Sequence, residues 1–262
     1  MTINLGRLCH GGAFILADTH SYQSDGNARK DGKILRHDGK RISFAITDAS
    51  ADANAAKALL STIGRRFAYE AKKWSDIEKI AMREMTSWYK AYKEAPTTYF
   101  TGAIMLKGRK PSIRLCTFEP PKRVTIHEDG YASNGVGATI ADLIHDLVCE
   151  PVHYSNPQMA LREALYLLYR VDKANVYCRG IDGYFLDLKR QAIFHINHED
   201  IKEAFKFGFQ LDIVLSTATF VMLGTEGEWF ANNVSSVGDA IKMCDKLRKL
   251  VFHDVAGNEL GS

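Results

Sequence analysis

The sequence of 262 residues lacks the features that define several large classes of protein. Its longest apolar run, Leu211 to Leu223, is interrupted by polar residues and is too short to span a bilayer. Its beginning has no basic segment followed by an apolar one, so we expect no secretory signal. The five cysteines are scattered and include no Cys-x-x-Cys pair, which favours a reducing compartment and predicts a cytoplasmic protein.

An excess of charge of one sign is also absent. The chain has 34 Lys and Arg against 31 Asp and Glu, and its net charge of +3 is too small to predict binding to nucleic acid or to an anionic membrane. With 46% hydrophobic and 25% charged residues, it has the composition of a globular chain with a sizeable core. We expect a single domain over 1–262, with its core in 2–200 and a packed C-terminal extension in 201–262.

Hydrophobic periodicity predicts strands and helices in alternating blocks. Period-two alternation and turn signals predict strands, and apolar stripes at helical spacing predict helices. The expected order is strands, helices, strands, helices, strands, which favours an α+β fold of two stacked sheets with helices on both outer faces. The expected strands are 2–9, 13–17, two within 33–47, 99–106, 112–118, 124–126, 184–188, 192–196 and 211–223. The expected helices run from Asp48 to Gly64, from Ser75-x-x-Glu78 to Pro96, over 140–148 and 156–171, and after Ser236-x-x-Asp239.

The start of the chain carries the strongest chemical signal. If Met1 is removed, Thr2 becomes a residue that holds both a nucleophilic hydroxyl and a free α-amine, whose ordinary pKa is about 8. Other Ser and Thr nucleophiles need a separate base. A turn at His10-Gly11-Gly12 would return the chain so that Asp18 lies beside Thr2.

These residues resemble the opening of the proteasome β-subunits and their bacterial relatives among the N-terminal-nucleophile hydrolases. Ala-Asp stands sixteen residues after the Thr, Lys33 opens a strand, and Thr47 to Ala53 is similar to the family's entry to its first long helix. Residues 131–138 are similar to its Gly-rich turn before the third helix. The resemblance covers roughly residues 2–190 and implies a four-layer αββα sandwich.

The resemblance also implies a catalytic mechanism. Thr2 attacks an amide carbonyl, its own amine accepts the proton, and the acyl-enzyme is then hydrolysed. Lys33 acts through its charge, Asp18 supports Lys33, and the backbone N–H of Asp48 faces the oxyanion. No cofactor and no metal ion are needed. By position, the residues that shape the pocket before the cleaved bond are Ser21, Ile46 and Ser50, which favour an apolar side chain.

The same resemblance implies self-assembly into a homo-oligomeric ring or related closed chamber that acts on peptides or unfolded proteins. A regulatory ATPase partner is not identified by the sequence.

Three departures from the family pattern keep other functions open. Asp48 stands where the family has Gly, Val136 where it has Ser, and Asn175 to Cys178 where it has Asp-x-x-Ser, unless Asp172 supplies that carboxylate. An inactive scaffold or interaction subunit, or an amidase acting on small amides, therefore remains an alternative to a threonine peptidase.

Two other motifs carry little functional signal. Gly135-Val136-Gly137 lacks the third glycine of a phosphate-binding loop. His195-x-x-His198 has no evident Cys or carboxylate partner for a zinc ion.

Overall fold

The computed structural model describes residues 3–22, 28–30, 33–92, 96–148, 156–174, 180–199, 201–203 and 206. The chain divides into two compact units, Met1–Ile201 and Lys202–Ser262, and almost all described residues belong to the first. The strand expected over 211–223 and the helix expected after Ser236 lie outside the described residues. The packing of the C-terminal extension therefore stays a prediction.

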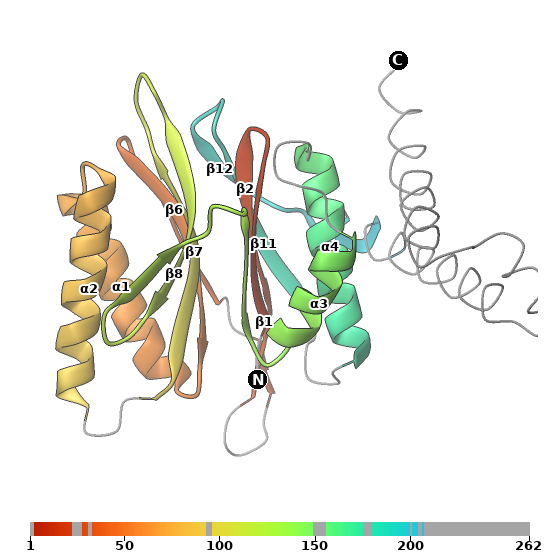
Figure 1. The fold of residues 1–262 in the computed structure, drawn as a ribbon, viewed down its shortest axis with the longest axis horizontal. Coiled ribbons are helices and arrows are strands. Elements are labelled where there is room, and N and C mark those ends of the chain that lie inside the picture. The colour runs from red at the N-terminus through yellow and green to blue at the C-terminus, as the bar shows by residue number, and fades with distance from the viewer. Residues whose placement is uncertain are drawn as a thin grey trace, which may run out of the picture. The chain divides into compact units, whose positions relative to one another are not determined.

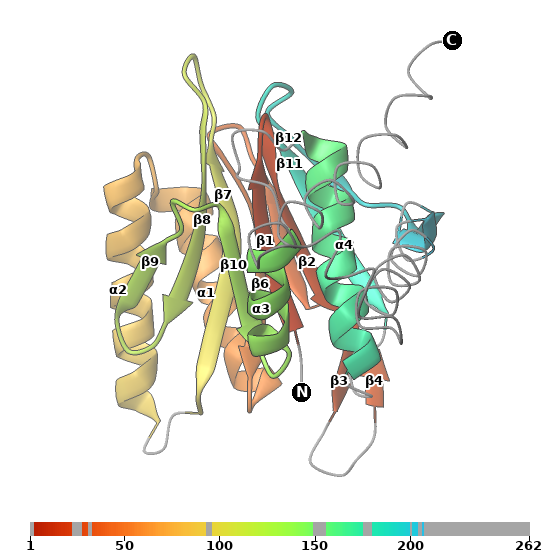
Figure 2. The same ribbon diagram turned by 45° about the vertical axis from the view of Figure 1, so that its right-hand side comes forward.

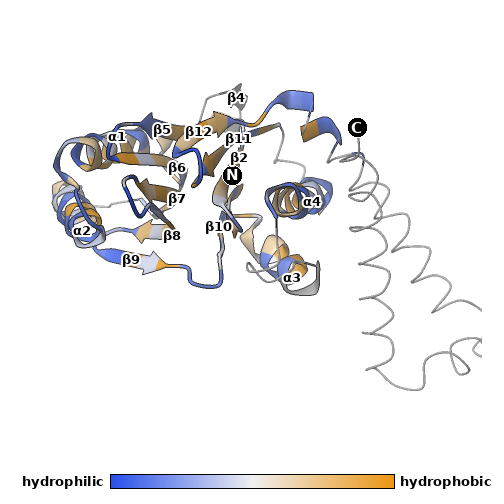
Figure 3. Ribbon diagram, turned by 90° about the horizontal axis from the view of Figure 1, so that it is seen from above, coloured by the Kyte–Doolittle hydropathy of each residue, from blue (hydrophilic) through white to orange (hydrophobic). Residues whose placement is uncertain are grey.

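Two five-stranded antiparallel sheets pack face to face in the first unit, and a pair of helices covers each outer face (Figure 1, Figure 3). The strand orders are β10-β1-β2-β11-β12 and β5-β6-β7-β8-β9. This arrangement confirms the expected four-layer αββα sandwich. The strands of the first sheet are β1 (Ile3–Cys9), β2 (Gly12–Asp18), β10 (Tyr131–Gly135), β11 (Ile181–Asp187) and β12 (Ala192–His195). Those of the second are β5 (Ile34–Asp38), β6 (Ile42–Ser50), β7 (Thr98–Leu106), β8 (Ser112–Glu119) and β9 (Arg123–Ile126). A separate ribbon joins β3 (His20–Tyr22) and β4 (Ala28–Lys30).

The four helices divide into two pairs. Helices α1 (Ala53–Glu70) and α2 (Trp74–Ala91) cover the second sheet, and α3 (Ala138–Val148) and α4 (Pro157–Ala174) cover the first (Figure 2). One buried cluster joins α1 and α2 to the second sheet, and another fills the space between the sheets. The apolar stripes that predicted the helices are thus the faces that they bury.

The hairpins predicted from alternation are confirmed. Asp38 and Gly39 stand at the turn between β5 and β6, where the Gly39 N–H donates to the Ile42 carbonyl over 3.0 Å. Strand pairs β7/β8 and β11/β12 likewise form antiparallel hairpins from consecutive predicted strands.

The prediction that Asp48 caps the first helix is wrong. Asp48 lies within β6, opposite Phe100 of β7, because sheet pairing holds this stretch extended until Ser50. Asp52 caps α1 instead, and its Oδ1 accepts from the N–H groups of Asn54 and Ala55 over 3.0 Å each.

Gly64 does not end this helix, which continues to Glu70. A Cβ at Gly64 would lie 2.6 Å from the Leu35 Cδ2 and 3.2 Å from the Phe44 Cζ. The glycine is therefore the point of close approach between α1 and the second sheet.

The second helix also begins differently from its predicted Ser75-x-x-Glu78 box. Asp76 makes the cap, since its Oδ2 accepts from the N–H groups of Lys72 (3.0 Å) and Lys73 (3.2 Å). The helix starts at Trp74 and ends at Ala91, ahead of Pro96.

Candidate active site at the start of the first strand

The start of β1 is tied to two of the predicted site residues. Because β1 and β2 pair with Asn4 opposite Ala17, Ile3 and Asp18 meet at the open end of the hairpin. The Ile3 N–H donates to Asp18 Oδ1 over 2.9 Å, and Lys33 Nζ donates to the same oxygen over 2.9 Å. Thr2 itself lies outside the described residues.

The Asp18–Lys33 pair is almost completely removed from water. The side chains are 2% and 8% exposed, respectively. Burying two charges costs more than their attraction returns unless further hydrogen bonds satisfy them, and here the backbone of β1 supplies one. The buried pair therefore does not by itself indicate a gain in stability. It indicates that two charges are held in fixed positions beside the start of β1.

The fourth predicted catalytic residue, Asp48, brings a second carboxyl group to this region. Ile34 lies opposite Thr47, so the next antiparallel position pairs Lys33 with Asp48. Burial raises the pKa of Asp48 to about 6, the charge of Lys33 opposes this shift, and the charge of Asp18 adds to it. The side chain that replaces the family's Gly is thus a partly buried acid whose charge changes close to neutral pH.

Replacing Asp48 with Asn should stabilise the protein above the pKa of Asp48. A raised pKa means that the native state favours the protonated acid, so the wild type loses stability as pH rises from about 4 through about 6. We expect the free energy of unfolding of Asp48→Asn to exceed the wild-type value by on the order of 2 kcal/mol near pH 8. The two proteins should match near pH 4. Urea unfolding at both pH values tests this, and an equal difference at the two would contradict it.

The predicted pocket residues occupy three different settings. Ser21 lies in β3, and the structure describes its backbone but not its side chain. Ile46 is fully buried in the cluster between the second sheet and α1. Ser50 Oγ lies 2.7 Å from Thr98 Oγ1 and accepts from the Asp52 N–H over 3.1 Å. A role for any of them in substrate binding stays a prediction.

The other departures from the family pattern lie in or beyond the helices of the first sheet. Val136 is 56% exposed in the turn between β10 and α3 and offers no polar side-chain atom. Asp172 lies in the last turns of α4. Asn175 to Cys178 are outside the described residues, so the part played by this segment or by Asp172 stays a prediction.

A buried ion pair that sequence reasoning missed holds β1 against the helices. Arg7 and Glu163 are each 1% exposed and lie 3.0 Å apart (Nη2 to Oε2), and Arg7 Nη1 lies 3.3 Å from His145 Nε2. The His145 ring stacks on Tyr131 with centroids 3.8 Å apart. One signal was present: Arg7 interrupts the apolar row of β1, and Glu163 interrupts the apolar stripe of α4.

Replacing Glu163 with Gln should lower the free energy of unfolding by about 2 kcal/mol, because the buried Arg7 loses its counter-charge while an acceptor oxygen remains. Urea unfolding at neutral pH measures the loss. The exposed Glu128→Gln is the matched control and should stay within about 0.5 kcal/mol of wild type. A Glu163→Gln protein as stable as this control would contradict the assignment.

Four polar residues, of which three are buried and Asn134 is half-buried, form a layer between the sheets near the same end. Asn4 lies opposite Asn134 in the first sheet, and Thr47 lies opposite Thr101 in the second. The Thr47 hydroxyl donates to Asn4 Oδ1 over 3.0 Å, and Asn134 Nδ2 donates to Thr101 Oγ1 over 2.6 Å. These two bonds cross from sheet to sheet and fix how the strands that carry Asp48 and Asp18 face each other.

Other kinds of site find little support in the described part of the chain. It contains no group of three or more His, Cys, Asp or Glu side chains that could hold a metal ion. His195 Nε2 instead lies 2.8 Å from Asp182 Oδ1. Burial raises the pKa of the Cys9 and Cys116 thiols to about 12, so neither is an activated nucleophile. None of the described helices is long and apolar enough to cross a membrane.

Comparison with known proteins finds similarity in structure alone. No family model matches the sequence, and no curated protein matches it. The fold matches an Anbu (Gly-1) mutant from Hyphomicrobium sp. strain MC1 with a TM-score of 0.71 and 14% identity, over 86% of this chain and 100% of that one. Anbu (ancestral beta-subunit) from Yersinia bercovieri gives 0.71 and 12% over 86% and 99%. The helical assembly of the Anbu complex from Pseudomonas aeruginosa gives 0.67 and 10% over 87% and 99%.

These identities are low, so the similarity concerns the fold and does not extend to activity. The αββα sandwich described above, expected from the resemblance to proteasome β-subunits, is the fold that this chain shares with the Anbu structures.

Proposed function

We propose that the chain is a proteasome-like threonine peptidase whose nucleophile is Thr2, exposed by removal of Met1. The observation that supports this most is the convergence of the Ile3 N–H and Lys33 Nζ on one buried oxygen of Asp18. This ion pair places the positive charge of Lys33 close to Ile3, the residue that follows Thr2.

In the proposed reaction the Thr2 hydroxyl attacks the amide carbonyl, and the α-amine of the same residue takes its proton. The amine passes that proton to the departing amine as the acyl-enzyme ester forms. Water then hydrolyses the ester, with the α-amine again as base. The charge of Lys33 disfavours protonation of the α-amine and so keeps more of it in the basic form, while Asp18 holds Lys33 in place.

We further propose that the protein works as a homo-oligomer in the cytoplasm and cleaves peptides or unfolded proteins. The support for self-association is the shared fold with Anbu, one structure of which is a helical assembly. No cofactor enters this reaction.

Asp48 favours a second candidate function, an inactive scaffold subunit. A backbone N–H survives the change from Gly to Asp, but an ionised carboxyl group close to Lys33 would repel a developing oxyanion. A third candidate, an amidase of small amides, uses the same Thr2 chemistry without a closed assembly.

Hydrolysis assays with matched substrates separate these candidates. A set of fluorogenic peptides and a set of small amides carrying the same leaving group should be tested on protein whose intact mass shows loss of Met1, with particle size measured on the same sample. A peptidase cleaves the peptides as a large particle. Cleavage of the small amides alone by a monomer favours the amidase. No hydrolysis of either set by a processed, assembled protein favours the scaffold.

A further inference from the structure

The opposite end of the sandwich from the start of β1 carries a concentration of positive charge. Four hairpin turns, those of β1/β2, β5/β6, β7/β8 and β11/β12, lie at this end together with the turn between α1 and α2 (Figure 1). We call this surface the basic rim. Its cations are Lys40, Arg41, Lys72, Lys73, Lys107, Arg109, Lys110, Lys189 and Arg190, and its carboxylates are Asp38, Glu70, Asp76 and Asp187. Cations thus outnumber carboxylates by about two to one on the rim, although the whole chain is nearly balanced.

Hydrogen bonds between the turns make the basic rim one connected surface. The Lys107 N–H donates to the Arg41 carbonyl over 2.8 Å. Gln191 spans the two sheets, because its Oε1 accepts from the Gly108 N–H over 2.9 Å and its Nε2 donates to the Gly108 carbonyl over 3.2 Å. The start of α2 joins through Trp74, whose Nε1 donates to Ser112 Oγ over 3.1 Å.

Every carboxylate of the rim is already engaged. Asp38 pairs with Lys107 Nζ at 2.5 Å. Burial by itself would raise the pKa of Asp38, but the hydrogen bonds from Lys107 and Ser43 hold this pKa below its ordinary value. Asp187 accepts from the Arg190 N–H over 2.8 Å. Asp76 caps α2, and Glu70 pairs with two arginines of α1 and α2.

Six rim cations are exposed and have no hydrogen-bond or ion-pair partner for their side chains within the described part of the chain: Lys40, Lys72, Lys73, Arg109, Lys110 and Lys189. Two exposed aromatic residues contact two further rim cations, Arg41 and Arg190. Tyr69 is 76% exposed and its carbonyl accepts from Arg41, and Phe194 is 39% exposed beneath the Arg190 guanidinium.

We propose that the basic rim is a docking surface for an acidic peptide segment of a partner protein. Hydrogen bonds between the turns fix the backbone positions from which the unpaired cations project, so the turns themselves need little ordering when carboxylates bind. The exposed rings of Tyr69 and Phe194 would contact apolar residues within such a segment. This inference goes beyond the proposed peptidase function and does not depend on Thr2.

A protein partner fits the rim better than a nucleic acid. The sequence pI of about 8.5 is lower than is usual for nucleic-acid-binding domains.

Fluorescence anisotropy with the full-length protein tests the proposal. The probe is a fluorescein-labelled peptide of repeating Glu-Glu-Leu units, compared with repeating Ser-Ser-Leu and with single-stranded oligothymidine. We expect the Glu-Glu-Leu peptide to bind at least about tenfold more tightly than the Ser-Ser-Leu peptide, with an affinity that falls as salt is raised.

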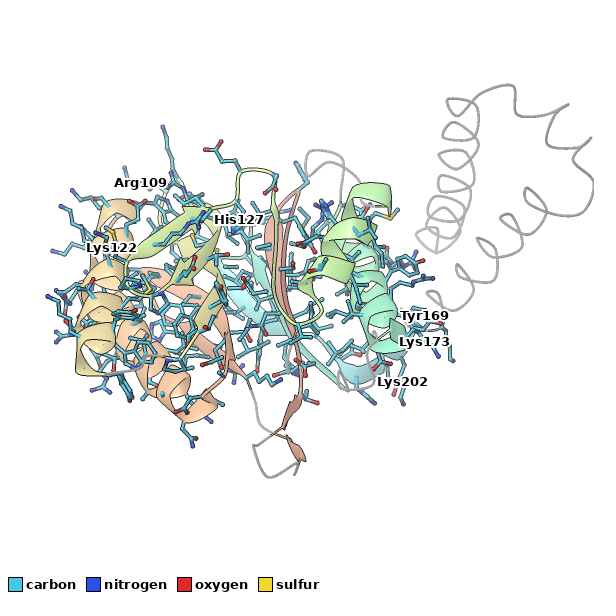
Figure 4. The ribbon with its side chains drawn as sticks, turned by 60° about the horizontal axis from the view of Figure 1, so that its bottom comes forward. Arg109, Lys122, His127, Tyr169, Lys173 and Lys202 are labelled. Atoms are coloured by element: carbon cyan, nitrogen blue, oxygen red, sulfur yellow. The ribbon has the colours of Figure 1, made fainter. Side chains whose placement is uncertain are left out.

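The variant Lys110→Glu/Lys189→Glu changes one turn from each sheet. The control Lys90→Glu/Lys122→Glu has the same net charge and uses exposed lysines that have no hydrogen-bond or ion-pair partner among the described residues (Figure 4 labels Lys122 and the rim residue Arg109). Lys122 follows β8 at the end away from the rim, about 25 Å along an eight-residue strand. The rim variant should weaken peptide binding at least about tenfold and the control less than about twofold.

Equal weakening by the rim variant and the control would overturn the proposal, because only net charge would then matter. Oligothymidine binding as tightly as the acidic peptide would overturn it in favour of a nucleic-acid surface. The Thr2→Ala protein should bind the peptide as the wild type does, so loss of the proposed peptidase activity leaves this test intact.

Discussion

Replacing Thr2 with Ala should reduce peptide hydrolysis at least about a thousandfold, which corresponds to about 4 kcal/mol of activation free energy. The substitution removes the attacking oxygen but keeps the α-amine and, on the proposed mechanism, leaves the Asp18–Lys33 pair in place. The kcat of a processed, purified protein on a fluorogenic peptide measures the loss, with intact mass confirming removal of Met1 in both proteins.

Two further variants sharpen this result. Thr2→Ser keeps a hydroxyl and should retain measurable hydrolysis. Thr62→Ala removes a hydroxyl from α1, where it donates to the Ala58 carbonyl, and should hydrolyse peptides as the wild type does. Undiminished hydrolysis by the Thr2→Ala protein would show that another group is the nucleophile.

Replacing Lys33 with Met should damage both activity and stability. Removing the ammonium group takes the charge of Lys33 away from the buried Asp18 carboxylate, which costs about 3–5 kcal/mol of unfolding free energy. Peptide hydrolysis should fall at least roughly a hundredfold, because the charge that tunes the Thr2 amine is lost. Urea unfolding and kcat on the same preparation measure the two effects, and the exposed Lys79→Met should change neither.

The double variant Asp18→Asn/Lys33→Met separates the structural role of Lys33 from its catalytic role. Replacing Asp18 with Asn removes the buried negative charge, and the Asn Oδ1 can still accept from the Ile3 N–H. Most of the lost stability should therefore return. Hydrolysis should not return, because the positive charge is still missing. Recovery of both stability and hydrolysis would mean that the pair is structural and that the proposed mechanism is wrong.

Sequence patterns predicted the layers of this fold because those patterns reflect local geometry. Alternation in β6 and the Asp38-Gly39 turn define a hairpin over a dozen residues. The apolar stripes of α1 and α4 define which faces are buried. Placing both sheets in one sandwich needed only the order of these blocks.

The ends of helices and strands were less predictable, because they depend on pairing with strands that are distant in the sequence. The sequence predicted a helix cap at Asp48, and only the pairing of β6 with β7 shows that Asp48 is still in the sheet and that Asp52 caps the helix. Gly64 likewise predicts the end of a helix in sequence, and only its close approach to Leu35 and Phe44 explains why a glycine stands within the helix.

For the candidate site, the resemblance to proteasome β-subunits implied that Asp18 supports Lys33, and the structure places the two side chains 2.9 Å apart. The sequence did not predict the Arg7–Glu163 pair, whose members are separated by most of the first unit. Nor did it predict that Asp48 would contribute a carboxyl group near Lys33, because that placement depends on the register between β5 and β6.

The most direct test of the central claim is to map, by mass spectrometry of proteolytic fragments, where a threonine-directed electrophile attaches to the purified protein. The account predicts a single adduct on a fragment that begins at Thr2 and lacks Met1, with labelling strongly reduced in the Lys33→Met protein. Retention of Met1, or an adduct at any other residue, would contradict it.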